Sequence, residues 1–129
     1  QALLGFQFVG VLTDAFDRLP AGSRHVHVAS LLLSAVTVTL LIAPAAFHRL
    51  AERGEATPRQ LRVSTAFLLA SMVTLPPAMT GDLFVVVRKA TDSGPLAAAV
   101  AAGVLVLFYA VWFVPGAVVR LRQQRRPAA

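Results

Sequence analysis

The chain has 129 residues, of which 57% are hydrophobic and only 14% are charged, whereas an ordinary soluble domain carries about 25% charged residues. Its mean hydropathy is +0.70. This composition excludes an intrinsically disordered chain, and it argues against a water-soluble domain, which has to cover its surface with polar side chains. We therefore interpret the sequence as that of a membrane protein.

The formal net charge of the chain is +6. A nucleic-acid-binding protein would need these basic groups on one soluble face, but long apolar runs separate them, so we expect no nucleic-acid partner. The sequence contains no cysteine and none of the common catalytic motifs, which are the GxSxG elbow, the P-loop, the dinucleotide fingerprint and HExxH. These absences predict a protein that is not an enzyme and that needs no cofactor.

The first apolar run begins at Ala2 and is followed by a turn at Pro20-Ala21-Gly22. We predict a helix over residues 2–17. Its apolar part, from Ala2 to Thr13, would be about 18 Å long as a helix, whereas the hydrocarbon core of a bilayer is about 30 Å thick. Because the sequence starts at Gln1 and not at methionine, we expect further residues upstream that complete this crossing.

Three longer apolar runs follow, and each is bounded by charged residues, glycine or proline. They predict helices over residues 28–47, 63–87 and 96–119. Strands are excluded because hydrophobicity does not alternate with a period of two, and because lipid offers no partner to an open strand edge. The predicted fold is an all-α, integral membrane four-helix transmembrane bundle, in a single domain over residues 1–129 that ends in a basic tail over residues 120–129.

Basic residues are distributed unequally between the two sides of the predicted bundle. One side holds eight arginines: Arg49, Arg53, Arg59, Arg62, Arg120, Arg122, Arg125 and Arg126. The other side holds four basic residues: Arg18, Arg24, Arg88 and Lys89. Because cytoplasmic connections are richer in lysine and arginine, we predict a multi-pass protein of the bacterial inner membrane with both termini in the cytoplasm. The arginines of the tail should contact anionic lipid headgroups, so bound lipid is an expected partner.

The third predicted helix contains Pro76-Pro77, and two consecutive residues without a backbone N–H should break it there. The carbonyls of Met72 and Val73 would then lose their intrahelical partners. A hydroxyl group, a water molecule or a neighbouring helix could replace these partners; the nearby hydroxyls are those of Ser71, Thr74 and Thr80. The break could form an ion or substrate site, or it could be a kink that only shapes the bundle. We favour the kink, because prolines are common in membrane helices.

Asp82 lies in an apolar stretch six residues before Arg88. A carboxylate at lipid depth is costly, so it should be paired, hydrated or protonated. One interpretation is a proton or cation pathway, because histidine titrates near neutral pH; it would combine Asp82 with Asp14, Asp17, His25, His27 and the break at Pro76-Pro77. The alternative is a cluster of ion pairs at the membrane surface. The i,i+4 spacing of Asp14 and Arg18 favours this alternative.

The three histidines are candidate ligands of a pigment, a haem or a metal ion. His25 and His27 alternate in the sequence and would point to one side only in an extended backbone, where Asp17 or Asp82 could complete a ligand set. Two ligands do not make a zinc site, and we predict no metal. His48 adjoins Arg49 at the end of a predicted helix, where a polar side chain that interacts with the helix terminus is the commoner arrangement.

The last predicted helix opens with small residues that repeat every four positions. Ala98 with Ala102, and Ala99 with Gly103, have the small-xxx-small spacing that lets two membrane helices approach closely. We expect this face to pack against another helix, either within the bundle or in a second protein.

Several stretches resemble a family of small bacterial four-helix membrane proteins that is known only as a domain of unknown function. The resemblance rests on residues 2–7 (ALLGFQ), 41–50 (LIAPAAFHRL), 81–89 (GDLFVVVRK) and the pair Trp112-Phe113. It covers nearly the whole chain, and some members carry an automatically assigned sodium/proton antiporter label. The resemblance implies a fold and a membrane location, and it assigns no catalytic or binding residue.

We expect a non-enzymatic membrane protein that packs against other transmembrane helices, as an accessory or structural subunit of a larger complex or as a homo-oligomer. The first alternative is a small proton or cation transporter that uses Asp82 and Asp14. The second is a pigment- or haem-binding subunit that uses His48 or the pair of His25 and His27.

Overall fold

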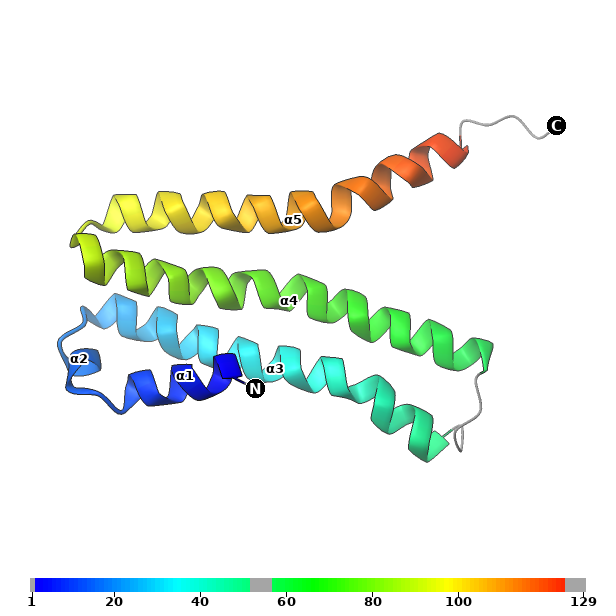
Figure 1. The fold of residues 1–129 in the computed structure, drawn as a ribbon, viewed down its shortest axis with the longest axis horizontal. Coiled ribbons are helices and arrows are strands. Elements are labelled where there is room, and N and C mark those ends of the chain that lie inside the picture. The colour runs from blue at the N-terminus through cyan, green and yellow to red at the C-terminus, as the bar shows by residue number, and fades with distance from the viewer. Residues whose placement is uncertain (1, 52–56, 125–129) are drawn as a thin grey trace.

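A computed structural model of the protein describes residues 2–51 and 57–124, and these residues form α-helices without any β-strand. The helices are α1 (Ala2–Val11), α2 (Asp14–Asp17), α3 (Ala21–Ala51), α4 (Pro58–Thr91) and α5 (Gly94–Gln124). Figure 1 shows α3, α4 and α5 side by side in this order, with α1 beside the N-terminal half of α3. The predicted all-α fold is confirmed, with four main helices and the single turn α2.

Three of these helices are long and apolar enough to cross a membrane. Helices α3, α4 and α5 contain 31, 34 and 31 residues, so that each is at least about 46 Å long and exceeds a hydrocarbon core of about 30 Å. Helix α1 has 10 residues. It extends along only part of α3 (Figure 1), so within the described residues the first predicted helix does not reach the length of a crossing.

The distribution of side chains is the reverse of that in a water-soluble protein. The buried hydrophobic residues of the described chain are small, namely Ala78, Val85 and Ala97. Large hydrophobic side chains lie on the outside instead, for example those of Phe6, Leu12 and Val106; the side chain of Leu12 is 85% exposed. Exposed apolar surface of this extent is unfavourable in water, whereas a surrounding hydrocarbon phase solvates it.

Helices α3 and α4 pack closely through small and hydroxyl-bearing residues. The buried side chains of α3 are Ser23, Ser30, Ser34 and Thr37, which recur every three, four or seven positions and therefore share one face of the helix. Thr37 Oγ1 lies 2.7 Å from Thr74 Oγ1 of α4. A Cβ atom at Gly81 would overlap with Oγ of Ser30, so the absent side chain of Gly81 is what allows this approach.

The ends of the helices differ from the prediction. The predicted helix over 2–17 is divided into α1 and α2, because Thr13 is extended, with φ −100° and ψ 147°, and its hydroxyl donates to the carbonyl of Gly10 at 2.8 Å. Helices α3, α4 and α5 are longer at both ends than the predicted ranges 28–47, 63–87 and 96–119. The polar residues at their ends continue the helical backbone beyond the apolar runs.

The predicted break at Pro76-Pro77 was wrong, because α4 is helical through both prolines. Pro77 has no N–H to donate to the carbonyl of Val73. Instead, the hydroxyl of Tyr109 on α5 donates to this carbonyl at 2.8 Å. A neighbouring helix therefore supplies the missing donor for Val73. The nearby hydroxyl of Thr80 donates to the carbonyl of Pro76 at 2.8 Å.

The bond between Tyr109 and Val73 predicts a specific coupling between two substitutions. Tyr109→Phe should lower the free energy of unfolding by about 1 kcal/mol, because it leaves a carbonyl in lipid without a donor. Pro77→Ala restores a backbone N–H that can donate to Val73, so Tyr109→Phe should cost less in that background. The free energy of unfolding should be measured in mixed micelles of lipid and sodium dodecyl sulfate for the parent protein, the two single variants and the double variant. Equal costs of Tyr109→Phe in both backgrounds would contradict the assignment.

Candidate functional site

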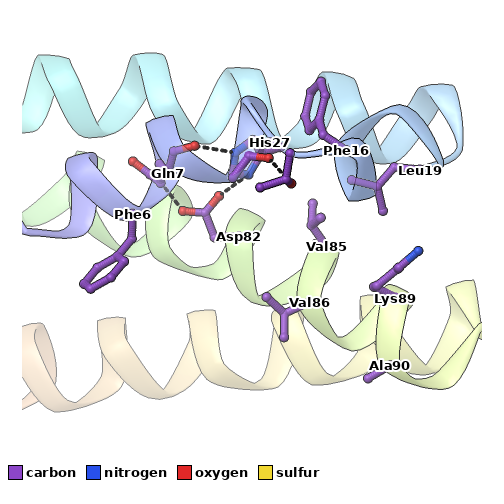
Figure 2. Close-up of a pocket in the computed structure, with 12 residues that line it drawn as sticks. Phe6, Gln7, Phe16, Leu19, His27, Asp82, Val85, Val86, Lys89 and Ala90 are labelled. Carbon is purple, nitrogen blue, oxygen red and sulfur yellow. Dashed lines mark hydrogen bonds and ion pairs between the residues drawn. The ribbon is translucent and has the colours of Figure 1, made fainter.

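Three polar side chains from three helices meet between α1, α3 and α4. They are those of Gln7 on α1, His27 on α3 and Asp82 on α4, and we refer to them as the polar cluster (Figure 2). His27 Nδ1 lies 3.0 Å from Asp82 Oδ1. The amide nitrogen of Gln7 donates to Asp82 Oδ2, and His27 Nε2 lies 3.2 Å from the carbonyl oxygen of Gln7. The imidazole thus bridges the backbone of α1 and the carboxylate of α4.

The polar cluster is largely shielded from the surroundings. The side chains of His27 and Asp82 are 12% and 18% exposed, and Gln7 is 5% exposed. Two buried oxygen atoms, Asp82 Oδ1 and Gln7 Oε1, make no hydrogen bond within the described residues. The 3.0 Å contact between His27 Nδ1 and Asp82 Oδ1 is therefore within ion-pair distance but lacks hydrogen-bond geometry, and Gln7 Oε1 has no polar partner in the described chain.

The polar cluster lies within the apolar length of the helices. Asp82 precedes the charged residues Arg88 and Lys89 in the last turn of α4, and at the rise of an α-helix it lies about 9 Å inside the level of Arg88. A charged group at this depth needs polar partners. Gln7 and His27 supply them from the two adjacent helices.

The helical phase of α3 explains why His27, and not His25, joins the polar cluster. Residues three or four positions apart share a helix face, so His27 lies on the same face as Ser23 and Ser30. His25 is exposed, and because the backbone is helical at both histidines the two rings do not share a side. The ring of Phe16 packs against His27 with centroids 5.7 Å apart and planes inclined at 60°.

A pocket of about 570 Å³ adjoins the polar cluster. It runs between α1 and α2 on one side and the end of α4 on the other, as Figure 2 shows. Asp82, His27 and Gln7 contribute the polar groups at one end of the pocket, and Lys89 lies two turns further along α4. The remaining lining residues are Phe6, Gly10, Thr13, Phe16, Leu19, Val85, Val86 and Ala90. The pocket is therefore an apolar space with acceptor groups at one end.

The other predicted members of the ion pathway do not join this site. Asp14 and Asp17 are exposed on α2 and do not line the pocket. Within residues 2–51 and 57–124 the one contact between an acidic and a basic side chain within ion-pair distance is that of His27 with Asp82, so the expected pair of Asp14 and Arg18 is not formed. Both side chains point into open surroundings at α2, where solvent competes with pairing.

The candidate pigment and metal ligands remain apart from one another. His48 lies in the last turn of α3, far along this helix from His27, and its Nδ1 atom is buried without a hydrogen-bond partner in the described chain. The part of the chain that the structure describes contains no group of three or more potential metal ligands. The arrangement therefore brings no two histidines to one site.

The small residues of α5 face outward. Ala98, Ala99, Ala102 and Gly103 are exposed, and no atom lies within 4 Å of a Cβ position built on Gly103. The contact with α4 uses another face of α5, on which Ala97 is fully buried. Arg120 and Arg122 are exposed near the end of α5, whereas Arg125 and Arg126 lie outside the described residues.

The sequence prediction did not identify Gln7 as a member of the site. A single amide in an apolar run is also typical of ordinary contacts between membrane helices. Its depth could have identified it, because a polar residue in the middle of α1 and an acid about two and a half turns before the end of α4 both need a partner in lipid.

These features define an integral membrane protein of the all-α class, with a polar cluster within the apolar length of its helices. The chain belongs to the family of unknown function DUF6328, which it matches over residues 1–115. This match confirms the resemblance to an uncharacterised family. No curated protein and no solved structure matches the chain.

Proposed function

We propose that the protein is a small proton transporter of the bacterial inner membrane, in which His27 and Asp82 bind the transported proton. The observation that carries this proposal is the 3.0 Å contact between His27 Nδ1 and Asp82 Oδ1 at lipid depth and beside a pocket. Carboxylate and imidazole groups within membrane helices are the usual elements of proton relays. The proposal rests on Asp82 and not on Asp14, which lies apart from this pair.

The chemistry of the pair supports proton exchange over a purely structural role. Asp82 Oδ1 is buried and accepts no hydrogen bond, and its polar contact is with the ring of His27, a type of side chain that exchanges protons near neutral pH. Gln7 donates to the other oxygen and holds the carboxylate in place. Protonation of either partner changes the charge contact that links α3 to α4, and through the Gln7 carbonyl it also changes the link to α1.

The distribution of arginines supports an orientation for this transporter. The end of α3, the start of α4 and the end of α5 lie together at one end of the molecule (Figure 1). That end carries Arg49, Arg59, Arg62, Arg120 and Arg122. By the positive-inside rule we place it in the cytoplasm, so the pocket beside the polar cluster opens toward the outer side.

This orientation predicts the labelling of single cysteines, for which the cysteine-free chain gives no background. Thr91→Cys, at the end of α4, should react with a membrane-impermeant maleimide added to intact cells. Gln123→Cys, near the end of α5, should react only after the membrane has been permeabilised. Labelling of Gln123→Cys and not of Thr91→Cys in intact cells would invert the orientation.

Proton flux into proteoliposomes tests the proposed function. Vesicles loaded with a pH-sensitive dye and potassium, and then treated with valinomycin, develop a negative interior potential. Vesicles that contain the protein should acidify faster than protein-free vesicles of the same lipid. Equal rates in the two preparations, at a verified protein content, would refute proton transport.

A second candidate function is the packing subunit expected from the sequence, and the outward-facing small residues of α5 favour it. This face lets another helix approach closely, and α4 does not cover it. Gly103→Leu should then dissociate a complex that native mass spectrometry detects in mild detergent, whereas Gly5→Leu on α1 should not. A strictly monomeric parent protein would exclude this function.

A further inference from the structure

We infer that the pocket beside the polar cluster binds a lipophilic ammonium ion, that is, an amine with one or more N–H groups and an apolar body. The inference rests on the proposed function in placing its chemistry at Asp82, and it adds the class of molecule that the site accepts. Binding at equilibrium requires no movement of protons across the membrane.

The polar end of the pocket holds a carboxylate and a buried acceptor that has no hydrogen-bond partner in the described chain. Gln7 Oε1 is this acceptor, and Asp82 Oδ1 makes no hydrogen bond and lies 3.0 Å from His27 Nδ1. Both residues line the pocket. An unpaired buried acceptor is costly, and a charged donor compensates it best. A protonated amine carries several N–H donors and a positive charge, so it complements the carboxylate in both respects.

The walls of the pocket define the rest of the ligand. Apart from the polar cluster, Thr13 and Lys89, the lining is aliphatic or aromatic, and it includes the rings of Phe6 and Phe16. The volume of about 570 Å³ falls within the range of small-molecule sites. Aromatic rings also attract cations. The pocket therefore suits an apolar body of moderate size attached to the ammonium group.

The positive charge of Lys89 does not oppose this occupant. Lys89 lies seven residues after Asp82, which corresponds to about 10 Å along the helix. Its side chain is exposed, and Figure 2 shows its ammonium group pointing away from Asp82. An anionic amphiphile could pair with Lys89, but its binding would leave Gln7 Oε1 at the other end without a donor.

The test compares three probes of similar shape on the full chain in lipid nanodiscs. The probes are 4-phenylbutylamine, the neutral 4-phenylbutanol, and 4-phenylbutanoate as an anion. Equilibrium dialysis against protein-free nanodiscs corrects for partition into lipid. We expect saturable binding of the amine, with the alcohol and the anion at least about tenfold weaker, because a charge-assisted hydrogen bond is lost. Binding of the alcohol or the anion as tight as that of the amine would overturn the inference.

Two substitutions locate the amine. Asp82→Asn should weaken its binding about tenfold or more. Gly10→Leu tests the pocket without altering a polar residue: a Cβ at Gly10 lies 3.7 Å from His27 Nε2, so it fits, and the longer side chain occupies space in the pocket. Gly5→Leu is the matched control on the same helix, because no atom lies within 4 Å of its Cβ position.

Gly10→Leu should abolish binding and Gly5→Leu should retain it. Amine binding that Gly10→Leu leaves unchanged would refute the pocket as the site. Proton flux without amine binding would refute this inference alone, and amine binding without flux would refute the proposed transport alone.

Discussion

Replacing Asp82 with asparagine should reduce proton flux into proteoliposomes to the level of protein-free vesicles. The amide keeps nearly the same shape, and it can still meet the amide of Gln7 across their present contact. It cannot, however, take up and release a proton near neutral pH. The loss should therefore be one of transport and not of folding, and it should be measured with the pH-sensitive dye at equal protein content.

Asp92→Asn is the matched control for this substitution. Asp92 is exposed at the end of α4, and its φ of 51° places it in the left-handed region, which asparagine adopts readily. This variant removes the same charge ten residues from Asp82 and should retain the parental flux. Loss of flux in both variants, or in neither, would show that Asp82 does not bind the transported proton.

Gly81→Leu should destabilise the protein by about 3 kcal/mol, the upper part of the range for overfilled interiors. The Cβ atom alone would overlap with Ser30 Oγ, and it would already be in van der Waals contact with Val26 Cγ1 at 3.5 Å. The remaining atoms of a leucine side chain have no space between α3 and α4. These two helices would have to separate, and the adjacent polar cluster would open with them.

Thermal unfolding of Gly81→Leu in detergent, compared with that of Gly103→Leu, measures this effect. Both variants place the same side chain at a glycine within a helix, and both gain the same helix propensity. No atom lies near the Cβ position of Gly103, so the stability of the monomer should not fall there. Equal stability of the two variants would mean that α3 and α4 do not meet at Gly81.

The fold could be predicted largely from hydropathy, because a chain in lipid must satisfy its backbone within helices. The ends of the helices could not be predicted in this way, since the apolar runs are shorter than the helices that contain them. The predicted break at Pro76-Pro77 was wrong for a different reason. The donor that replaces the missing N–H at Val73 is the hydroxyl of Tyr109, which is distant in sequence and becomes a neighbour only when α5 packs on α4.

The candidate site was predicted in part. Asp82 stood out because a carboxylate in an apolar run requires an explanation, and both His27 and Asp82 were proposed for a proton pathway. The choice between His25 and His27 needed the knowledge that α3 begins at Ala21, since only a helical backbone separates the two rings. Gln7 and the pocket depend on how α1 lies against α3 and α4, which no local pattern in the sequence specifies.

The small buried residues of the described helices determine which substitutions the protein can tolerate. Its interior contains mainly hydroxyl-bearing residues and alanine in place of large apolar groups, so truncation to alanine removes little volume and leaves no sizeable cavity. Added atoms, in contrast, force neighbouring helices apart. A systematic mutational scan of the α3–α4 interface should therefore show that larger side chains lower stability strongly and that smaller ones lower it little. In the core of a soluble protein, truncation of side chains is the more damaging change.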